Sequence, residues 1–330
     1  NFPIKKTFNT YYIPIGEERV TIPNYYGDLN QTRFGFEVTR KLVNDKSVFI
    51  RLETDFNGGT TGKFRIRHAY GQLHRFLIGQ TWSLFSNVTA LPSTVNSDGP
   101  TGSVILRTPQ IRYYGSNMRG TRWAVALEYS RPDINFQELD TIGLSTVQII
   151  PDLTARIERE GIFGAVQLSG VLTTLSVMDA DNNVTNSIGI GGSLSGTIDF
   201  IGSQILYQFT YGNSISHFIT TFDGTGHDAI YNPETGDVEP LTSFGGFIAY
   251  DYKWLTVLSS NIAVGYANLS NKSYQPDFAY SNSMSTAVNT FWQVSEGAKL
   301  GLEYIYGHRW NTSGKSDGAS RIGVLFYYDF

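Results

Sequence analysis

Apolar and polar residues alternate along many short segments of the chain. The last ten residues show this most clearly, because one face of the segment holds only apolar and aromatic side chains. That face consists of Ile322, Val324, Phe326, Tyr328 and Phe330, and the opposite face consists of Arg321, Gly323, Leu325, Tyr327 and Asp329. A period of two predicts a β-strand with one face against an apolar medium.

The same period recurs upstream. Phe34, Phe36 and Val38 alternate with charged or small residues, and later segments also keep their charges on a single side. We therefore predict fifteen strands, and nothing in the composition marks a boundary between domains. The predicted strands span residues 32–40, 47–55, 64–71, 74–82, 104–114, 121–130, 151–159, 162–174, 186–199, 202–211, 242–252, 255–268, 284–294, 297–307 and 319–330.

The number of strands decides which face meets water. No segment approaches the roughly 20 apolar residues of a membrane helix, but strands of about 9–11 residues also cross a bilayer. Fifteen such strands enclose a cylinder too wide for side chains to fill, so the polar face must line an aqueous lumen. We expect residues 1–330 to form a single all-β domain, a transmembrane antiparallel β-barrel. The strand that ends on Phe330 favours the bacterial outer membrane, where barrels with this dyad pattern occur.

Short and long connections alternate between the predicted strands. We expect the short ones (71–73, 115–120 and 251–254) in the periplasm and the long ones (83–103, 131–150 and 213–241) outside the cell. Bacterial barrels normally have an even strand number, so this order leaves one ascending strand missing. Either residues 2–15 supply it, despite Pro3 and Pro14, or residues 1–31 are a partial external loop or N-terminal segment. We favour the second interpretation, because proline cannot donate to a ladder, and expect sixteen strands in the intact protein.

Positive charge gathers in the first half of the chain. Residues 31–130 contain 13 Lys and Arg against 6 Asp and Glu, a net charge of +7, whereas the whole chain carries −4, which leaves −11 elsewhere. Arginines along a narrow aqueous pore attract anions and bind carboxylates through two hydrogen bonds. The facing of Arg112 depends on whether Pro109 introduces a bulge. The candidate pore-lining and solute-binding residues are Arg33, Arg51, Arg65, Arg67, Arg75, Arg107, Arg112 and Arg122.

A structural role for these arginines is the alternative. Glu37, Glu53, Asp55 and Glu128 lie on the same strands and would form an ion-pair ladder that stiffens the wall without selecting a solute. We favour the pore function, because the arginines outnumber the carboxylates and leave an uncompensated positive field.

Residues 83–103 form a long connection rich in Ser, Thr and Asn. It contains Pro92, Pro100 and a single charged residue, Asp98. Such a loop either folds into the pore and sets the width of its narrowest point, or stays outside as an external loop or trimer latch. The sequence leaves both possibilities open. An inward fold would bring little negative charge and so would not attract cations strongly.

Four motifs resemble the DcaP-like outer-membrane porin family: FRIRHAYGQL (64–73), FLIGQTWSLF (76–85), DGPTGS (98–103) and RTPQIRYYG (107–115). A looser similarity covers 155–172 and 302–309 and reaches the C-terminal strand. The resemblance implies a trimeric, sixteen-stranded channel for small anions, dicarboxylates in particular, with arginines of the Arg65 and Arg67 type contributing to selectivity. The chain departs from the family at its start, where the first strand and the helical extension of many members have no counterpart.

Other chemistry finds less support in the sequence. No GxSxG motif occurs, and no histidine has metal-ligand spacing or a carboxylate partner that its spacing reveals. We therefore expect no enzyme activity, no metal and no cofactor. Asp179 and Asp181 with residues 182–183 have the hard oxygen ligands of a Ca²⁺ site, but an Asx-rich turn is the simpler interpretation. The histidines are His68, His74, His217, His227 and His308.

These patterns predict an outer-membrane porin, a passive diffusion channel for small hydrophilic solutes with a preference for anions. Aromatic residues at predicted strand ends, such as Trp123, Tyr129 and Trp254, fit interfacial girdles. The competing hypothesis is an adhesin or receptor-type barrel with a blocked lumen, whose long loops do the binding. Expected partners are small anionic solutes, outer-membrane lipid and lipopolysaccharide, and further copies of the chain in a homotrimer. No nucleic acid is expected.

Overall fold

The computed structural model describes residues 7–16, 23–42, 47–58, 62–117, 120–134, 144–179, 181–232, 234–235 and 237–329. The terminal Phe330 and the first six residues, including Pro3, lie outside the described residues, as do parts of the connections 131–150 and 213–241. Within the described part, no helix is long and apolar enough to cross a membrane.

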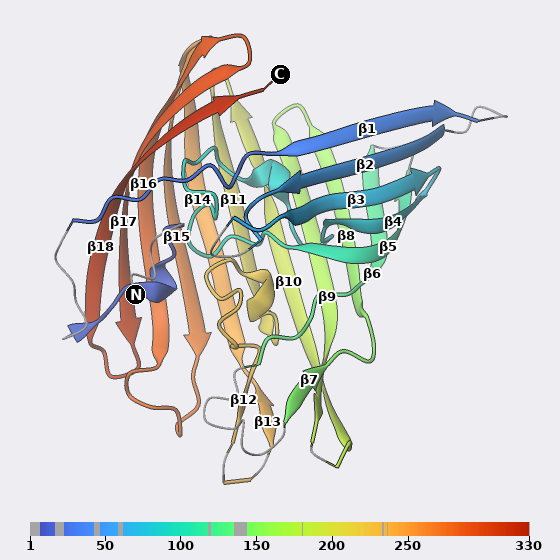
Figure 1. Cartoon of the computed structure of the whole chain (residues 1–330), viewed down its shortest axis with the longest axis vertical. Coiled ribbons are helices and arrows are strands. Elements are labelled where there is room, and N and C mark those ends of the chain that lie inside the picture. Colours follow the sequence, from blue (N-terminus) through green and yellow to red (C-terminus); the bar gives the residue numbers. More distant parts are fainter. Residues whose placement is uncertain are drawn as a thin grey trace.

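One antiparallel sheet of sixteen strands curves into a wall (Figure 1). Fifteen strands follow in chain order, each paired with the next, and the short β7 (Ser145–Val147) pairs with β9. The fifteen are β1 (Phe34–Lys41), β2 (Ser47–Asp55), β3 (Arg65–Leu73), β4 (Phe76–Trp82), β5 (Arg107–Ser116), β6 (Thr121–Glu128), β8 (Asp152–Gly161), β9 (Gly164–Met178), β10 (Val184–Phe200), β11 (Ser203–Asn213), β14 (Thr242–Leu255), β15 (Leu258–Ser270), β16 (Tyr280–Ser295), β17 (Ala298–Asn311) and β18 (Ser316–Tyr328).

Five other short elements lie off this path. The strands β12 (Ala229–Tyr231) and β13 (Val238–Pro240) form a separate hairpin. Three 3₁₀ helices occur in the connections and the N-terminal segment: η1 (Thr10–Tyr12), η4 (Val88–Ala90) and η5 (Ser216–Phe218). We call the concave side of the wall the lumen.

Each of the fifteen predicted segments coincides with one strand of the wall. The predicted fold class, an antiparallel outer-membrane-type β-barrel, is therefore confirmed. The predicted turn at 71–73 is wrong, because β3 continues to Leu73 and the chain reverses at His74 and Arg75, where His74 adopts a left-handed φ of 55°. The strands β7, β12 and β13 were not predicted, since three residues are too few to show a period.

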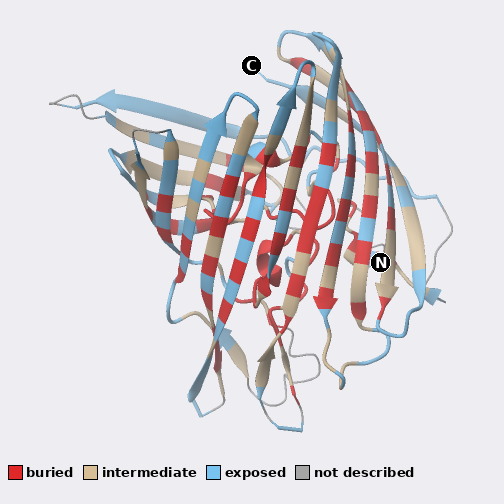
Figure 2. Cartoon of the chain, turned by 180° about the vertical axis from the view of Figure 1, so that it is seen from behind, coloured by how far each residue is buried: buried red, intermediate tan, exposed pale blue. Residues whose placement is uncertain are grey.

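Side chains alternate between the two faces along most of the wall. In β14, Ile248 and Tyr250 are exposed on the outer face, whereas Phe247 and Ala249 are buried on the lumen side. Figure 2 shows the resulting bands of buried and exposed residues along the strands. Because the exposed side chains are largely apolar and many buried ones are small or polar, the wall has the polarity of a membrane barrel.

The edges of the wall are β1 and β18, which run in the same direction because thirteen strands of alternating direction lie between them. No ladder joins these two edges among the residues that the structure describes. Residues 7–16 include η1 and pack in the lumen against β16 and β17. The described part of residues 2–15 therefore supplies no strand of the wall, contrary to one of the two interpretations of the sequence.

Candidate pore constriction

The connection between β4 and β5, residues 83–106, folds into the lumen and crosses it. Its backbone and side chains contact inward-facing groups of strands on opposite parts of the wall. Leu84 N donates to Glu128 of β6 at 2.9 Å, and Asn87 Nδ2 donates to Ser195 of β10 at 3.0 Å. Farther along, Val104 N donates to Gln208 of β11 at 2.7 Å. The loop is therefore an internal constriction loop, one of the two possibilities that the sequence left open.

Two buried carboxylates of the wall hold this loop by its backbone. Glu303 of β17 accepts from Asn96 N at 2.9 Å and from Val95 N at 3.0 Å. Glu128 accepts from Leu84 N and from Thr154 Oγ1, the latter at 2.7 Å. Hydrogen bonds to an ionised acceptor are about twice as strong as neutral ones. Glu128, a member of the ion-pair ladder in the alternative that we did not favour, anchors the loop where it leaves the wall.

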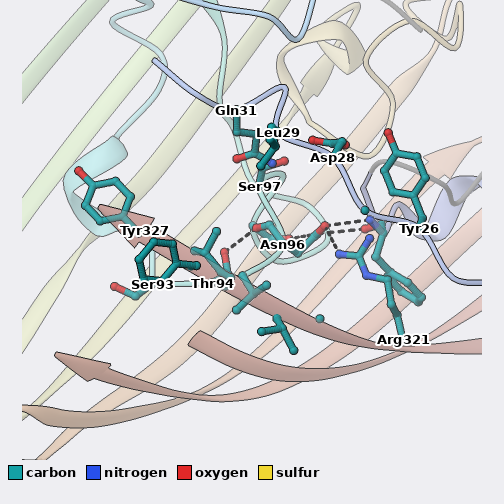
Figure 3. Close-up of a pocket in the computed structure, with 18 of the residues that line it drawn as sticks. Tyr26, Asp28, Leu29, Gln31, Ser93, Thr94, Asn96, Ser97, Arg321 and Tyr327 are labelled. Atoms are coloured by element: carbon teal, nitrogen blue, oxygen red, sulfur yellow. Dashed lines mark hydrogen bonds between the residues drawn. The ribbon is translucent and has the colours of Figure 1, made fainter. Parts of the chain in front are cut away.

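The side chain of Asn96 forms hydrogen bonds to three parts of the structure (Figure 3). Its Oδ1 accepts from Phe8 N of the N-terminal segment and from Arg321 Nη2 of β18, both at 2.8 Å. Its Nδ2 donates to Phe8 O at 3.1 Å and to Gly99 O at 3.3 Å. One side chain thus connects the constriction loop to the wall and to the N-terminal segment.

Three glycines allow the backbone of the constriction loop to contact the backbone of the wall directly. Gly102 has a left-handed φ of 83°, and a Cβ placed there would lie 2.2 Å from Tyr266 O. On the wall side, a Cβ on Gly265 would lie 2.2 Å from Thr101 O, and one on Gly245 would lie 2.7 Å from Gly102 O. Only hydrogen atoms fit at these three positions, so the approach of the loop depends on them.

The long connection after β11 also folds into the lumen, where it meets the N-terminal segment. Tyr11 Oη lies 2.8 Å from His227 Nε2 and its ring stacks on Tyr280 with the centroids 5.2 Å apart. Phe218 and Phe222 of this connection are fully buried in the same apolar cluster as Phe85 of the constriction loop. Figure 1 shows η5 and the segment after it inside the curve of the wall. Three segments distant in sequence therefore narrow one lumen.

This connection also contains a histidine–carboxylate pair that the sequence did not reveal. His217 Nδ1 lies 2.7 Å from Asp228 Oδ2, and Ser216 Oγ donates to Asp228 Oδ1 at 2.8 Å. Burial opposes the charged imidazole, but the Asp228 carboxylate outweighs it and raises the pKa of His217. Because Ser216 donates to the carboxylate rather than to His217, the group does not have the geometry of a serine nucleophile activated by a histidine.

Half of the predicted pore arginines form ion pairs. Arg65 donates two hydrogen bonds to Asp55, at 2.9 and 2.6 Å, and Arg67 bridges Glu53 and Asp55 at 2.6 and 2.9 Å. Arg51 pairs with Glu37 and Glu53. Arg122 pairs with Glu158 and Glu160 of β8, which were not among the carboxylates named for the ladder. The alternative of an ion-pair ladder therefore describes these four arginines in part.

The other four predicted arginines form no ion pair with any described residue. Arg33 lies exposed at the start of β1, and Arg75 lies in the turn after β3, where it donates to Tyr113 Oη at 3.4 Å. The Arg107 guanidinium stacks 3.5 Å above the Trp82 ring. Arg112 faces the lumen together with the buried Thr108 and Gln110. Because the β4–β5 register is continuous through Pro109 and no bulge forms there, Arg107 leaves the start of β5 on the opposite side from Arg112. Arg107 lies within electrostatic range of Arg33, Arg65 and Arg67.

A bulge does occur in β3, where the sequence gave no sign of one. The ladder with β2 pairs Glu53 with His68 and Thr54 with Ile66, so Arg67 is an extra residue. Arg67 and His68 are consecutive and both buried. His68 Nδ1 lies 3.0 Å from Thr81 Oγ1. The bulge thus concentrates polar side chains at one point of the lumen.

Two cavities open from the lumen on different sides of the constriction loop. The larger, of about 2530 Å³, is lined by loop residues 91–97 together with residues of β1, β2 and β18, Arg33, Arg51 and Arg321 among them. The smaller, of about 590 Å³, is lined by loop residues 86–89 and residues of β3 to β9, including Arg75, Arg112 and Arg122. Arg321 and Arg156, in the larger and the smaller cavity respectively, were not among the predicted site residues.

The candidate Ca²⁺ segment forms a turn that uses its own oxygens. Asp179 Oδ1 accepts from Asp181 N at 2.9 Å and from Asn183 N at 2.8 Å, as in an Asx turn. No group of acidic or histidine side chains suited to a metal ion occurs in the described part of the chain.

The wall, its inverted polarity and the loop across its lumen define an outer-membrane channel protein. The chain belongs to the DcaP outer membrane protein family, whose sequence model matches residues 7–330. The protein therefore resides in the bacterial outer membrane, as predicted, and is a channel protein. No curated protein matches the chain in sequence.

Solved structures with the same fold include three outer-membrane proteins. The DcaP channel of Acinetobacter baumannii superposes with a TM-score of 0.80 at 23% identity, over 91% of this chain and 85% of that one. An anion-selective porin from Comamonas acidovorans gives a TM-score of 0.62 at 12% identity, over 89% and 87% of the two chains. OmpT of Vibrio cholerae in its trimer form gives 0.55 at 10% identity, over 90% of each.

Proposed function

We propose that this channel conducts small hydrophilic solutes passively and prefers anions, dicarboxylates among them. The observation that carries the proposal is the set of arginines without a carboxylate partner around the constriction loop, above all the lumen-facing Arg112 and, at the end of the loop, Arg107. The resemblance to the DcaP family and the fold shared with an anion-selective porin support it. The proposed pore-lining residues remain Arg33, Arg51, Arg65, Arg67, Arg75, Arg107, Arg112 and Arg122.

The ion pairs divide these residues into two roles. Arg51, Arg65 and Arg67 share their charge with Glu37, Glu53 and Asp55, so they contribute directional hydrogen bonds more than net field. Arg107 and Arg112 add uncompensated positive charge near the constriction loop. A field of one sign in a narrow, low-dielectric passage raises the local concentration of counter-ions. We therefore assign the preference for anions chiefly to Arg107 and Arg112.

A receptor or adhesin with a blocked lumen is the second candidate function. The observation in its favour is the filling of the lumen by residues 7–16, the constriction loop and the connection after β11. Ohmic single-channel steps in a planar bilayer distinguish the two functions, because a plugged barrel gives none.

We also propose that the channel assembles as a homotrimer in contact with membrane lipid and lipopolysaccharide. The support is the family resemblance and the trimer form of a protein with this fold. Chemical cross-linking of the detergent-solubilised protein, followed by mass determination, tests the trimer.

The reversal potential across a tenfold KCl gradient tests the selectivity. We expect a potential of anion-selective sign, and the double variant Arg107→Gln and Arg112→Gln should move it towards zero. Arg159→Gln is the matched control, because Arg159 is exposed on the outer face of β8 and changes the net charge without reaching the lumen. A cation-selective potential in the unmodified protein would refute the proposed preference.

A further inference from the structure

The smaller cavity has a charge excess that the protein does not compensate. It lies on the side of the constriction loop nearer the short turns, and it shares no lining residue with the larger cavity. Its charged lining residues are Arg75, Arg112, Arg122, Arg156, Glu158 and Glu160, four positive against two negative.

One arginine takes up most of the negative charge. Arg122 Nε donates to Glu158 at 2.7 Å, and its Nη2 donates to Glu160. Arg156 reaches only the already shared Glu158, at the longer distance of 3.6 Å. Arg75, Arg112 and Arg156 therefore carry the remaining positive charge, and only Arg112 and Arg156 are shielded from solvent.

Arg112 is the more unusual of these two residues. It is 5% exposed, and its three hydrogen bonds go to neutral acceptors: Gln110 Oε1 at 2.8 Å, Tyr114 Oη at 3.1 Å and Trp82 O. Removing a charge from water without a counter-ion is costly, and a guanidinium has five N–H donors, so two of them remain for another acceptor. Arg156 lies within electrostatic range of Arg112 and of the Tyr114 phenol.

We propose that the smaller cavity is a binding site for one compact oxyanion, held between Arg112 and Arg156 with Arg75 at its rim. Two planar guanidinium groups match the oxygens of a carboxylate, sulfate or phosphate group, and the oxyanion supplies the missing counter-charge. The site rests on the proposed anion preference, since Arg112 takes part in both. It lies apart from the larger cavity, because loop residues 86–89 and 91–97 face different spaces. An anion that has passed the constriction would therefore bind at a second, saturable site.

Equilibrium dialysis of radiolabelled sulfate against the full chain in detergent micelles tests this site without requiring ion flow. We expect one saturable sulfate per chain at low ionic strength. Arg156→Gln should weaken the binding about tenfold, the effect of losing one charged hydrogen-bond donor group. Arg159→Gln, on the same strand but on the outer face, should bind sulfate as the unmodified protein does.

Arg156→Lys provides a second variant, because it keeps the charge and loses the planar fork. We expect its sulfate affinity to lie between those of the unmodified protein and Arg156→Gln, and a heat-sensitive gel shift shows that each variant is folded. Absence of saturable sulfate binding, or equal binding by folded Arg156→Gln, would overturn the proposal. Because dialysis measures no current, either result is distinct from a failure of the selectivity experiment above.

Discussion

The two halves of the wall differ in strand length and in the side chains that they present to the lumen. The first half, β1 to β8, has strands of 7–10 residues apart from the three-residue β7, and it carries the arginines and their carboxylate partners. The second half, β9 to β18 apart from the three-residue β12 and β13, has longer strands, up to 17 residues in β10. It presents mainly small or uncharged side chains and glycines to the lumen, with Glu303 and Arg321 among the charged exceptions. Ser283, Ser285 and Ala287 of β16 are typical of this surface.

The residues that we propose select ions therefore lie mainly in the first half, and the residues that make room for the constriction loop lie mainly in the second half. The glycines and short side chains of the second half leave room for the constriction loop to approach the backbone of β14 and β15. The arginines of the first half then face the space that the loop leaves open. The arginines of the first half can lose their charge without removal of the loop anchors Glu128 and Glu303, and the loop can be displaced at Gly265 without changing any charge.

The largest effect should come from filling the contact between the loop and the second half. Gly265→Val places side-chain atoms where Thr101 O lies, so the loop must leave its position. We expect single-channel conductance to rise at least about twofold, on the estimate that overpacking of 1–3 kcal/mol displaces the loop rather than the wall. Gly192→Val is the control, because a Cβ there has open space up to 4.0 Å from Ser169 O. Unchanged conductance in Gly265→Val would show that the loop does not set the pore width.

The second effect concerns the ion pairs of the first half. Replacing Arg65 and Arg67 by Gln removes two positive charges and also exposes the carboxylates of Glu53 and Asp55. We expect the reversal potential to move towards zero, because the freed carboxylates add unpaired negative charge to the lumen. Replacing Glu53 and Asp55 by Gln and Asn should shift the potential the opposite way. Shifts of the same sign in both pairs of variants would exclude this reading of the charges.

The third effect concerns the anchor of the loop on β17. Glu303→Gln keeps one acceptor oxygen for the backbone of residues 95–96 and loses the charge, at a cost of about 1–3 kcal/mol. We expect a lower midpoint of thermal unfolding and more frequent closures in single-channel records. Glu296→Gln, in the exposed turn before β17, is the matched control. Equal closure rates in both variants would contradict the anchoring role.

The smallest effect should be a dependence on pH at the N-terminal segment. Burial lowers the pKa of His227 to about 4, with Asp228 and Arg309 as the charged neighbours, so the docked imidazole is neutral. A released histidine has a pKa near 6.5, hence docking onto Tyr11 is strongest above pH 6.5 and weakens as pH falls towards 4, by at most about 1.4 kcal/mol per unit. We expect a modest rise in conductance over this window. His227→Gln should abolish the pH dependence, and its persistence there would assign the effect to another group.

The sequence was sufficient for the wall because strand alternation is a local property. Ile322, Val324 and Phe326 reveal their shared face by spacing alone, and all fifteen strands follow from such patterns. The contacts inside the lumen could not be predicted in this way. Asn96 and Phe8 are 88 residues apart, and Arg122 meets Glu158 only because β6 and β8 pair. Contacts of this kind depend on where loops turn once the wall exists, which no period in the sequence records.

The extra residue in β3 has a consequence for how such a chain can evolve. Substitutions at Arg67 or His68 alter one side chain each, but deletion of either would restore the simple alternation and reverse the facing of residues 69–73. Tyr70 would then point to lipid and Leu73 to water. Length changes of one residue in β3 should therefore be far rarer among natural descendants than changes of identity, whereas the exposed connections between strands can vary in length freely.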